Sequence, residues 1–159
     1  MVRFEVVTTP DKPVFQRAVL GLNGGPLDSA VVRLACGLAQ TGRSELVGVH
    51  VIEADWSHEL TDDLVGDSAV PQQILDAAEA IAERARVPMT TVLLQARNVG
   101  AAIADEAAQR EADLIVLGLP YRRRFGGDFD EGKVIPYVLA NARSRVWVVR
   151  EAQPAEDAA

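Results

Sequence analysis

The sequence predicts an α/β protein whose five-stranded, mainly parallel sheet is covered by helices on both faces. Five short apolar segments alternate along the chain with four segments whose apolar residues recur at helical spacing. This alternation is typical of parallel sheets built with right-handed crossover helices. The chain has 159 residues, 48% of them hydrophobic and 25% charged, which fits one soluble globular domain.

The first half of the pattern contains two strands and two helices. "AVLGL", residues 18–22, is apolar throughout and predicts a strand buried on both faces. Residues 26–42 follow with apolar residues at helical spacing and end at a glycine. "LVGVHVI", residues 46–52, predicts the second strand. After an acidic loop of about fifteen residues, long enough to be mobile or functional, residues 71–86 predict a helix with a proline in its first turn.

The second half repeats the pattern with "MTTVLL" as a strand at residues 89–94. A helix is predicted over residues 99–112, and "DLIVLGL", residues 113–119, predicts the fourth strand. A glycine-rich loop then leads into a helix over residues 133–142, and "RVWVV", residues 145–149, predicts the last strand. We expect the domain to span residues 16–150.

The two ends of the chain lie outside this pattern. Residues 1–15 form an N-terminal extension, which we interpret as an added strand followed by a proline-containing linker. Residues 151–159 are polar and alanine-rich and predict a disordered tail.

Composition excludes several classes of protein. The net charge of −7 argues against a nucleic-acid binder, which needs a basic surface. No apolar run is long enough to span a bilayer and no secretory signal opens the chain, so we expect a cytoplasmic protein. The single cysteine, Cys36, forms no intrachain disulfide or thiolate metal cluster, and its apolar helix neighbours predict a buried packing residue.

The loop after the fourth strand draws attention because "GGDFDEGKV" nearly matches a phosphate-binding loop. From Gly127 it fits G-x-x-x-x-G-K, but Val134 replaces the Ser or Thr that would bind Mg²⁺. A glycine turn opening a helix, with Lys133 at its start, suits a phosphate. The cationic side chains nearby are Arg122, Arg123 and Arg124, and the acidic ones that would repel a phosphate are Asp128, Asp130 and Glu131. Ligands of such sheets bind at the carboxyl ends of the strands, so residues 23–25 and those after Gly118 mark the expected site.

Other polar residues give no catalytic set. His50 lies inside a strand without a metal-binding partner set, which favours a structural role, and His58 lies in the acidic loop. Ser29 and Asp28 are interpreted as helix-initiating residues. We therefore expect a protein that is not an enzyme.

Four segments, taken in order, resemble the universal stress protein family across roughly residues 15–150. They are "RAVLGLNGG", "ELVGVHVIE", "EADLIVLG" and "GKVIPYVLANARSRVWVVR". The resemblance implies a Rossmann-like fold of the adenine nucleotide alpha hydrolase-like type and a role in stress response or regulation. It also implies a homodimer formed through the last strand, with Val146, Trp147 and Val148, and a cleft for ATP or another adenine nucleotide.

The nucleotide-binding branch of that family carries Gly-x-x-Gly, nine residues, then Gly and Ser or Thr. Here Gly118 matches, but Tyr121, a Gly132 that comes one residue late, Lys133 and Asn23 depart from the family pattern, so the motif is degenerate. The resemblance places Asn23 and Val51 beside the base and ribose, with Leu117 and Gly118 on the floor. It implies that the phosphate is bound by the backbone N–H groups of Gly132, Lys133 and Val134.

Two interpretations of this pattern stay open. One is a stress-response module that keeps a weak nucleotide cleft. The other is the cytosolic regulatory domain of an amino-acid or ion transporter, which resembles the same family and does not bind ATP. An ATP-hydrolysing enzyme would need a base and a metal ligand that the sequence does not supply.

Overall fold

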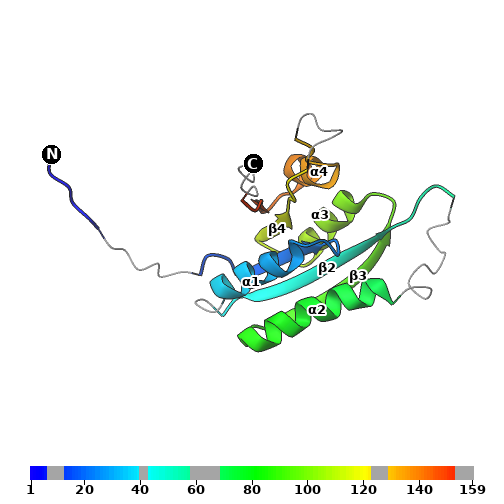
Figure 1. The fold of residues 1–159 in the computed structure, drawn as a ribbon, viewed down its shortest axis with the longest axis horizontal. Helices are drawn as coiled ribbons and strands as arrows, with labels where there is room; N and C mark the ends of the chain where they lie inside the picture. Colours follow the sequence, from blue (N-terminus) through cyan, green and yellow to red (C-terminus); the bar gives the residue numbers. More distant parts are fainter. Residues whose placement is uncertain (7–12, 40–42, 58–68, 123–128, 153–159) are drawn as a thin grey trace, which may run out of the picture.

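The computed structural model describes residues 1–6, 13–39, 43–57, 69–122 and 129–152. Its elements follow the predicted order of five strands and four helices (Figure 1). The strands are β1 (Arg17–Leu22), β2 (Glu45–Glu53), β3 (Met89–Ala96), β4 (Leu114–Gly118) and β5 (Arg145–Val149). The helices are α1 (Asp28–Ala39), α2 (Val70–Ala85), α3 (Val99–Gln109) and α4 (Val134–Asn141).

The sheet is parallel throughout and has the strand order β3-β2-β1-β4-β5. β1 lies in the middle and pairs with β2 on one side and β4 on the other. The chain therefore reverses its direction of travel across the sheet between these two neighbours of β1. Their carboxyl ends form the crevice in which open α/β sheets bind ligands.

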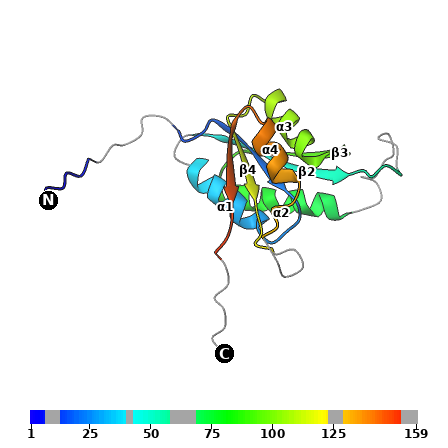
Figure 2. The same cartoon turned by 90° about the horizontal axis from the view of Figure 1, so that it is seen from above.

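Helices cover both faces of the sheet, with α1 and α2 on one face and α3 and α4 on the other (Figures 1 and 2). Each face has its own apolar core. The α1 and α2 core contains Leu20, Leu46 and Leu114, and the other contains Val19, Val49 and Ile115. Alternate residues of one strand thus enter different cores, as expected for a sheet buried on both sides.

The predictions for the two ends of the domain differ in outcome. Within residues 1–6 there is no strand, so the predicted added strand is wrong there, and residues 7–12 lie outside the described part. Phe15, assigned to the extension, is 1% exposed and belongs to the α1 and α2 core. Its carbonyl accepts a hydrogen bond from the Ser44 hydroxyl. The packed domain therefore includes Phe15, and most of the predicted tail, residues 153–159, is outside the description.

Cys36 agrees with its prediction, whereas α3 is shorter than predicted. Cys36 is buried among apolar residues of α1, as predicted, and burial raises the pKa of its thiol. α3 ends at Gln109, three residues earlier than predicted, because the chain turns through a left-handed Glu111 (φ 54°) before β4. Among the described residues, no helix combines the length and apolar character that crossing a bilayer requires.

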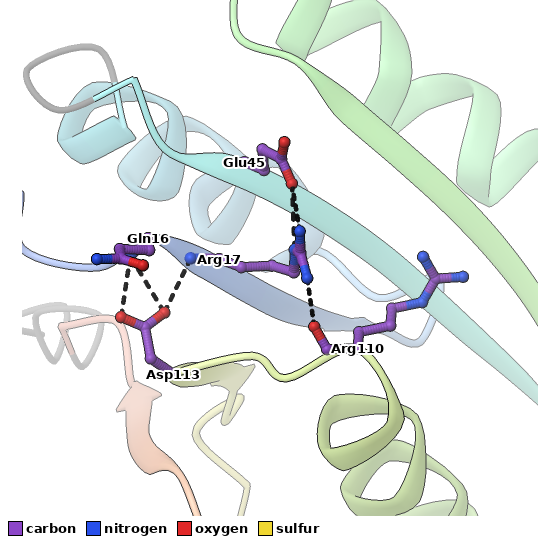
Figure 3. A network of polar contacts seen from close by, with 5 residues as sticks. All are labelled: Gln16, Arg17, Glu45, Arg110 and Asp113. Atoms are coloured by element: carbon purple, nitrogen blue, oxygen red, sulfur yellow. Dashed lines mark hydrogen bonds and ion pairs between the residues drawn. The ribbon is translucent and has the colours of Figure 1, made fainter.

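A polar network fixes the amino ends of three strands, at the edge opposite the crevice (Figure 3). The Arg17 guanidinium pairs with the Glu45 carboxylate at 3.0 Å and donates to the Arg110 carbonyl. The Asp113 carboxylate accepts backbone N–H bonds from Gln16 at 2.9 Å and from Arg17 at 2.8 Å. These bonds hold β1 in register with β2 and β4, which aligns the strand ends that carry the crevice.

Candidate functional site

A cleft of about 150 Å³ lies at the carboxyl ends of β1 and β4. Its walls come from the turn after β1, the start of α3, the segment after β4 and the start of α4. The lining residues are Gly21, Leu22, Asn23, Val99, Ile103, Leu117, Gly118, Leu119, Pro120, Arg122, Glu131, Gly132, Lys133, Val134 and Ile135. Two distant parts of the sequence, near residue 23 and over residues 117–135, therefore form one site, as the sequence predicts.

Six of the seven predicted site residues surround this cleft, and Val51 does not. The six are Asn23, Leu117, Gly118, Gly132, Lys133 and Val134. Val51 is 8% exposed and packs in the α3 and α4 core. It shares a sheet face with Val47 and Val49, since alternate residues of a strand point the same way. Its side chain therefore stabilises the sheet under the helices and does not line the cleft.

The turn after β1 is closed by its own side chains. The Asp28 carboxylate accepts N–H bonds from Asn23 at 3.2 Å and from Gly24 at 2.7 Å. The Asn23 side-chain oxygen accepts the N–H of Gly25 at 2.7 Å. All three amide hydrogens of this glycine turn are thus occupied, and a carboxylate already holds the position that an anion would take. This turn offers no free N–H group to a phosphate.

Asp28 has a second role besides the helix start that the sequence predicts. It does start α1, as predicted, but its carboxylate also folds back over the glycine turn. Burial raises the pKa of this carboxyl, while the two N–H bonds and the nearby His50 act to lower it. The sequence does contain a signal for this second role. An aspartate at the first helical position after a glycine turn can accept hydrogen bonds from the backbone N–H groups of that turn.

His50 performs a structural task beside this turn. Its Nδ1 lies 2.7 Å from the Leu22 carbonyl oxygen, which can only accept, so Nδ1 carries the proton in that bond. The bond links the last residue of β1 to β2. This agrees with the structural role that the sequence indicates for His50, whereas His58 and its acidic neighbours lie outside the described residues.

The turn before α4 is only partly closed. The Asp130 carboxylate accepts the N–H of Gly132 at 3.0 Å, so that amide is not available to a ligand. The N–H groups of Lys133 and Val134 have no hydrogen-bond partner within the described part of the chain. α4 begins without a side-chain cap. Two amide hydrogens and the positive end of the helix therefore face the cleft.

Charges of both signs line the cleft. Lys133 and Arg122 bring two cations, and Glu131 brings one anion. The predicted loop residues Arg123, Arg124, Gly127 and Asp128 lie outside the described part of the structure. Within that part, no group of three or more His, Cys, Asp or Glu residues is placed to hold a metal ion. Among the described residues that line the cleft, cations outnumber anions by one, which suits a singly or doubly charged phosphate.

A second, larger groove of about 400 Å³ adjoins the cleft, and both are bordered by Val99, Lys133 and Val134. Its outer wall is Trp56, which is 87% exposed, with the Arg97 guanidinium 4.4 Å from the centre of the indole ring. The sequence does not indicate this pair, because Trp56 and Arg97 meet only where β2 and β3 end side by side. The groove gives a ligand of the small cleft additional room.

The fold and the crevice define a Rossmann-like α/β protein with a site at the reversal of strand order. The universal stress protein family matches residues 15–150, and the chain belongs to this family.

Particular relatives extend this comparison. The sensor protein KdpD of Mycobacterium tuberculosis is 34% identical over 117 residues, which cover 74% of this chain but 12% of that protein. This chain thus corresponds to a small part of the curated relative. The universal stress protein from Archaeoglobus fulgidus has a TM-score of 0.69 at 21% identity, covering 85% of this chain and 98% of that one. A universal stress protein from Archaeoglobus fulgidus in complex with dAMP has a TM-score of 0.64 at 20% identity, covering 85% of this chain and 98% of that one. These solved structures establish the fold.

Proposed function

We propose that this chain is a non-catalytic regulatory module, active in stress response, that binds a purine mononucleotide weakly in the cleft. Adenine nucleotides are the first candidates, since a solved relative is described in complex with dAMP. The observation that carries the proposal is the pair of unpartnered N–H groups at Lys133 and Val134, beside the Lys133 ammonium group. A helix start of this kind binds phosphate through its backbone and its dipole.

The two turns orient the ligand. A phosphate is repelled from the first turn, where the Asp28 carboxylate already occupies the amides. It is attracted to the start of α4, where Lys133 lies. The base then lies toward Asn23, over the apolar side chains of Leu22 and Leu117. A nucleotide placed this way uses both ends of the cleft and leaves its sugar near the groove shared with Val99.

Weak binding follows from the size and charge of the site. The cleft, about 150 Å³, is smaller than the roughly 300–1,000 Å³ typical of small-molecule pockets. Glu131 opposes the phosphate charge, and Asp130 holds one of the three amides. No hydroxyl side chain follows Lys133 to hold a metal ion. These features favour a monophosphate over a triphosphate and support a binding role without hydrolysis.

Isothermal titration with AMP, dAMP and ATP, with and without Mg²⁺, tests the proposal. We expect millimolar to micromolar binding of the monophosphates, and a thermal shift equivalent to about 2.7 kcal/mol at a hundredfold excess over Kd. Lys133→Ala should weaken binding about tenfold, because it removes a charge-assisted contact. Arg143→Ala, which removes an exposed cation at the opposite end of the sheet, is the matched control. No heat and no thermal shift with any nucleotide would refute the binding site.

We also propose that the protein forms a homodimer through β5. Among the described residues, this strand pairs only with β4, and its outer edge carries backbone groups that no strand of the described sheet pairs. Val148 and Leu139 add exposed apolar surface on β5 and on α4, while Val146 and Trp147 are half-buried. Sedimentation equilibrium should give twice the monomer mass. Val148→Lys should shift it toward monomer, whereas Val70→Lys, an exposed change on α2, should not.

The similarity to KdpD favours a second candidate, a regulatory domain within a larger membrane-associated sensor or transporter. In this version the cleft serves contact with another part of the protein and binds no ATP. We place the domain in the cytoplasm in either case. A flat response to all nucleotides, combined with retained folding, would favour this candidate over the first.

A further inference from the structure

Asn23 carries an amide side chain whose orientation is fixed by its own turn. The N–H of Gly25 can only donate, so the atom of Asn23 that faces it at 2.7 Å is the oxygen Oδ1. The other half of the amide, the Nδ2 amino group, has no partner among the described residues. Asn23 is exposed and lines the cleft, so the polar group that it can offer to a ligand is a pair of N–H donors.

Among the described residues of the turn after β1, Asn23 is the one that brings a polar side chain to the lining of the cleft. The backbone N–H of Asn23 is directed to Asp28, and the neighbouring amides of the turn are occupied as well. The other parts of the cleft near Asn23 are the apolar Leu22 and Leu117. At this end of the cleft, the side-chain group available to a base is therefore the donor pair of Asn23.

Purine bases differ in what they present to such a donor. A 6-oxo purine such as guanine or hypoxanthine has two neighbouring acceptors, O6 and N7, along one edge. Adenine has the N7 acceptor but carries an amino group, itself a donor, at position 6. Two donors facing each other without an acceptor leave both unpaired, which costs binding energy.

We infer that Asn23 makes the cleft select a purine nucleotide with a 6-oxo group over the corresponding adenine nucleotide. This inference rests on the proposed function, because it assumes that the phosphate lies at the start of α4 and the base at the turn after β1. It adds the class of base to that proposal.

Inosine monophosphate and AMP test the inference directly, because they share the ribose and phosphate and differ at position 6 and in the protonation of the adjacent ring nitrogen. By isothermal titration we expect inosine monophosphate to bind about tenfold more tightly than AMP. Guanosine monophosphate should follow inosine monophosphate. Lys133→Ala should weaken both ligands by the same factor and leave their ratio unchanged.

Asn23→Asp provides the decisive variant. A carboxylate can still accept the Gly25 N–H, but it presents an acceptor to the cleft in place of the donor pair, so the preference should move to AMP. Asn23→Ala should bring the ratio close to one. Gln73→Glu, an exposed amide-to-acid change on α2, controls for added charge, and thermal unfolding of each variant confirms that it folds.

The outcomes separate this inference from the proposed function. Equal affinity of the wild-type protein for the two nucleotides, or tighter binding of AMP, overturns the inference while leaving the nucleotide site intact. A ratio that Asn23→Asp leaves unchanged also overturns it. Absence of binding by all the monophosphates overturns the nucleotide site and the inference together.

Discussion

The two glycine turns at the cleft differ in how completely they satisfy their own backbone. After β1, Asp28 and Asn23 take the N–H groups of residues 23–25. Before α4, the Asp130 carboxylate accepts the N–H of Gly132, and the next two amides have no hydrogen-bond partner among the described residues. The first turn therefore offers no free N–H group to an anion, whereas the second turn still has two. Under the proposed function, the first turn would contact the base through Asn23 and the second would bind the phosphate.

The largest effect should come from removing the carboxylate that closes the first turn. Asp28→Ala leaves the N–H groups of Asn23 and Gly24 without their acceptor, which we expect to lower the free energy of unfolding by about 1–3 kcal/mol. Urea denaturation measures this. Asp105→Ala, an exposed change on α3, should stay within about 0.5 kcal/mol of wild type. A loss of equal size in both variants would show that Asp28 does not hold the turn.

The glycines of the two turns should respond differently to a methyl group. Gly24 has φ 80° and its added Cβ would meet Ile74 Cδ1 at 2.8 Å, so Gly24→Ala should cost about 1–2 kcal/mol. Gly132 has φ 70° but open space around it, and its replacement by Ala should cost less. Gly37→Ala, at an open position inside α1, should raise stability by up to about 1 kcal/mol. Equal costs at Gly24 and Gly132 would contradict the comparison.

Opening the second turn fully should strengthen phosphate binding. Asp130→Ala releases the N–H of Gly132 and removes a negative charge, and we expect nucleotide monophosphates to bind about three- to tenfold more tightly. Titration calorimetry at two salt concentrations measures this, because the charge contribution should shrink at high salt. Unchanged or weaker binding by this variant would show that Asp130 organises the loop for the ligand.

The smallest expected effect is the change with pH in the stability that Asp28 gives to the protein. Burial raises the pKa of Asp28 above its ordinary value of 3.8 despite the opposing N–H bonds and His50. For a raised pKa, the stabilising contribution is complete below the ordinary value and is lost as pH rises through the raised value. The free energy of unfolding of the wild type, taken relative to that of Asp28→Asn, should therefore decrease as pH rises from about 3 to 7. An increase over this range would mean that the ionised carboxylate is the favoured form.

Periodicity predicts most of this fold because each strand and helix follows from the residue pattern of its own segment. The apolar run at residues 18–22 and the helical spacing of residues 71–86 each specify one element without long-range information. The strand order depends on contacts between distant segments, so the local pattern does not specify it. Phe15 was assigned to the wrong side of the domain boundary, because the two apolar residues after Pro13, Val14 and Phe15, are too few to show a periodicity.

The site was predictable to the level of segments. Gly118 and Lys133 lie at strand and helix ends, which the chain pattern locates, so their meeting follows from the parallel sheet. Val51 was chosen from the resemblance, although its alternation with Val47 and Val49 already indicates the core. The closure of the first turn by Asp28 and the meeting of Trp56 with Arg97 depend on side-chain directions that no periodicity encodes.

The burial of Phe15 has a practical meaning for anyone who wishes to graft this domain onto another protein. A graft that starts at Gln16 discards an aromatic ring from the packed interior and would forfeit about 3–5 kcal/mol, a large part of the stability of an ordinary domain. The hydrogen bond that the Ser44 hydroxyl donates to the Phe15 carbonyl would also be lost. Fusions should therefore be joined before Pro13, so that the attached protein enters near the amino ends of the strands, opposite the cleft.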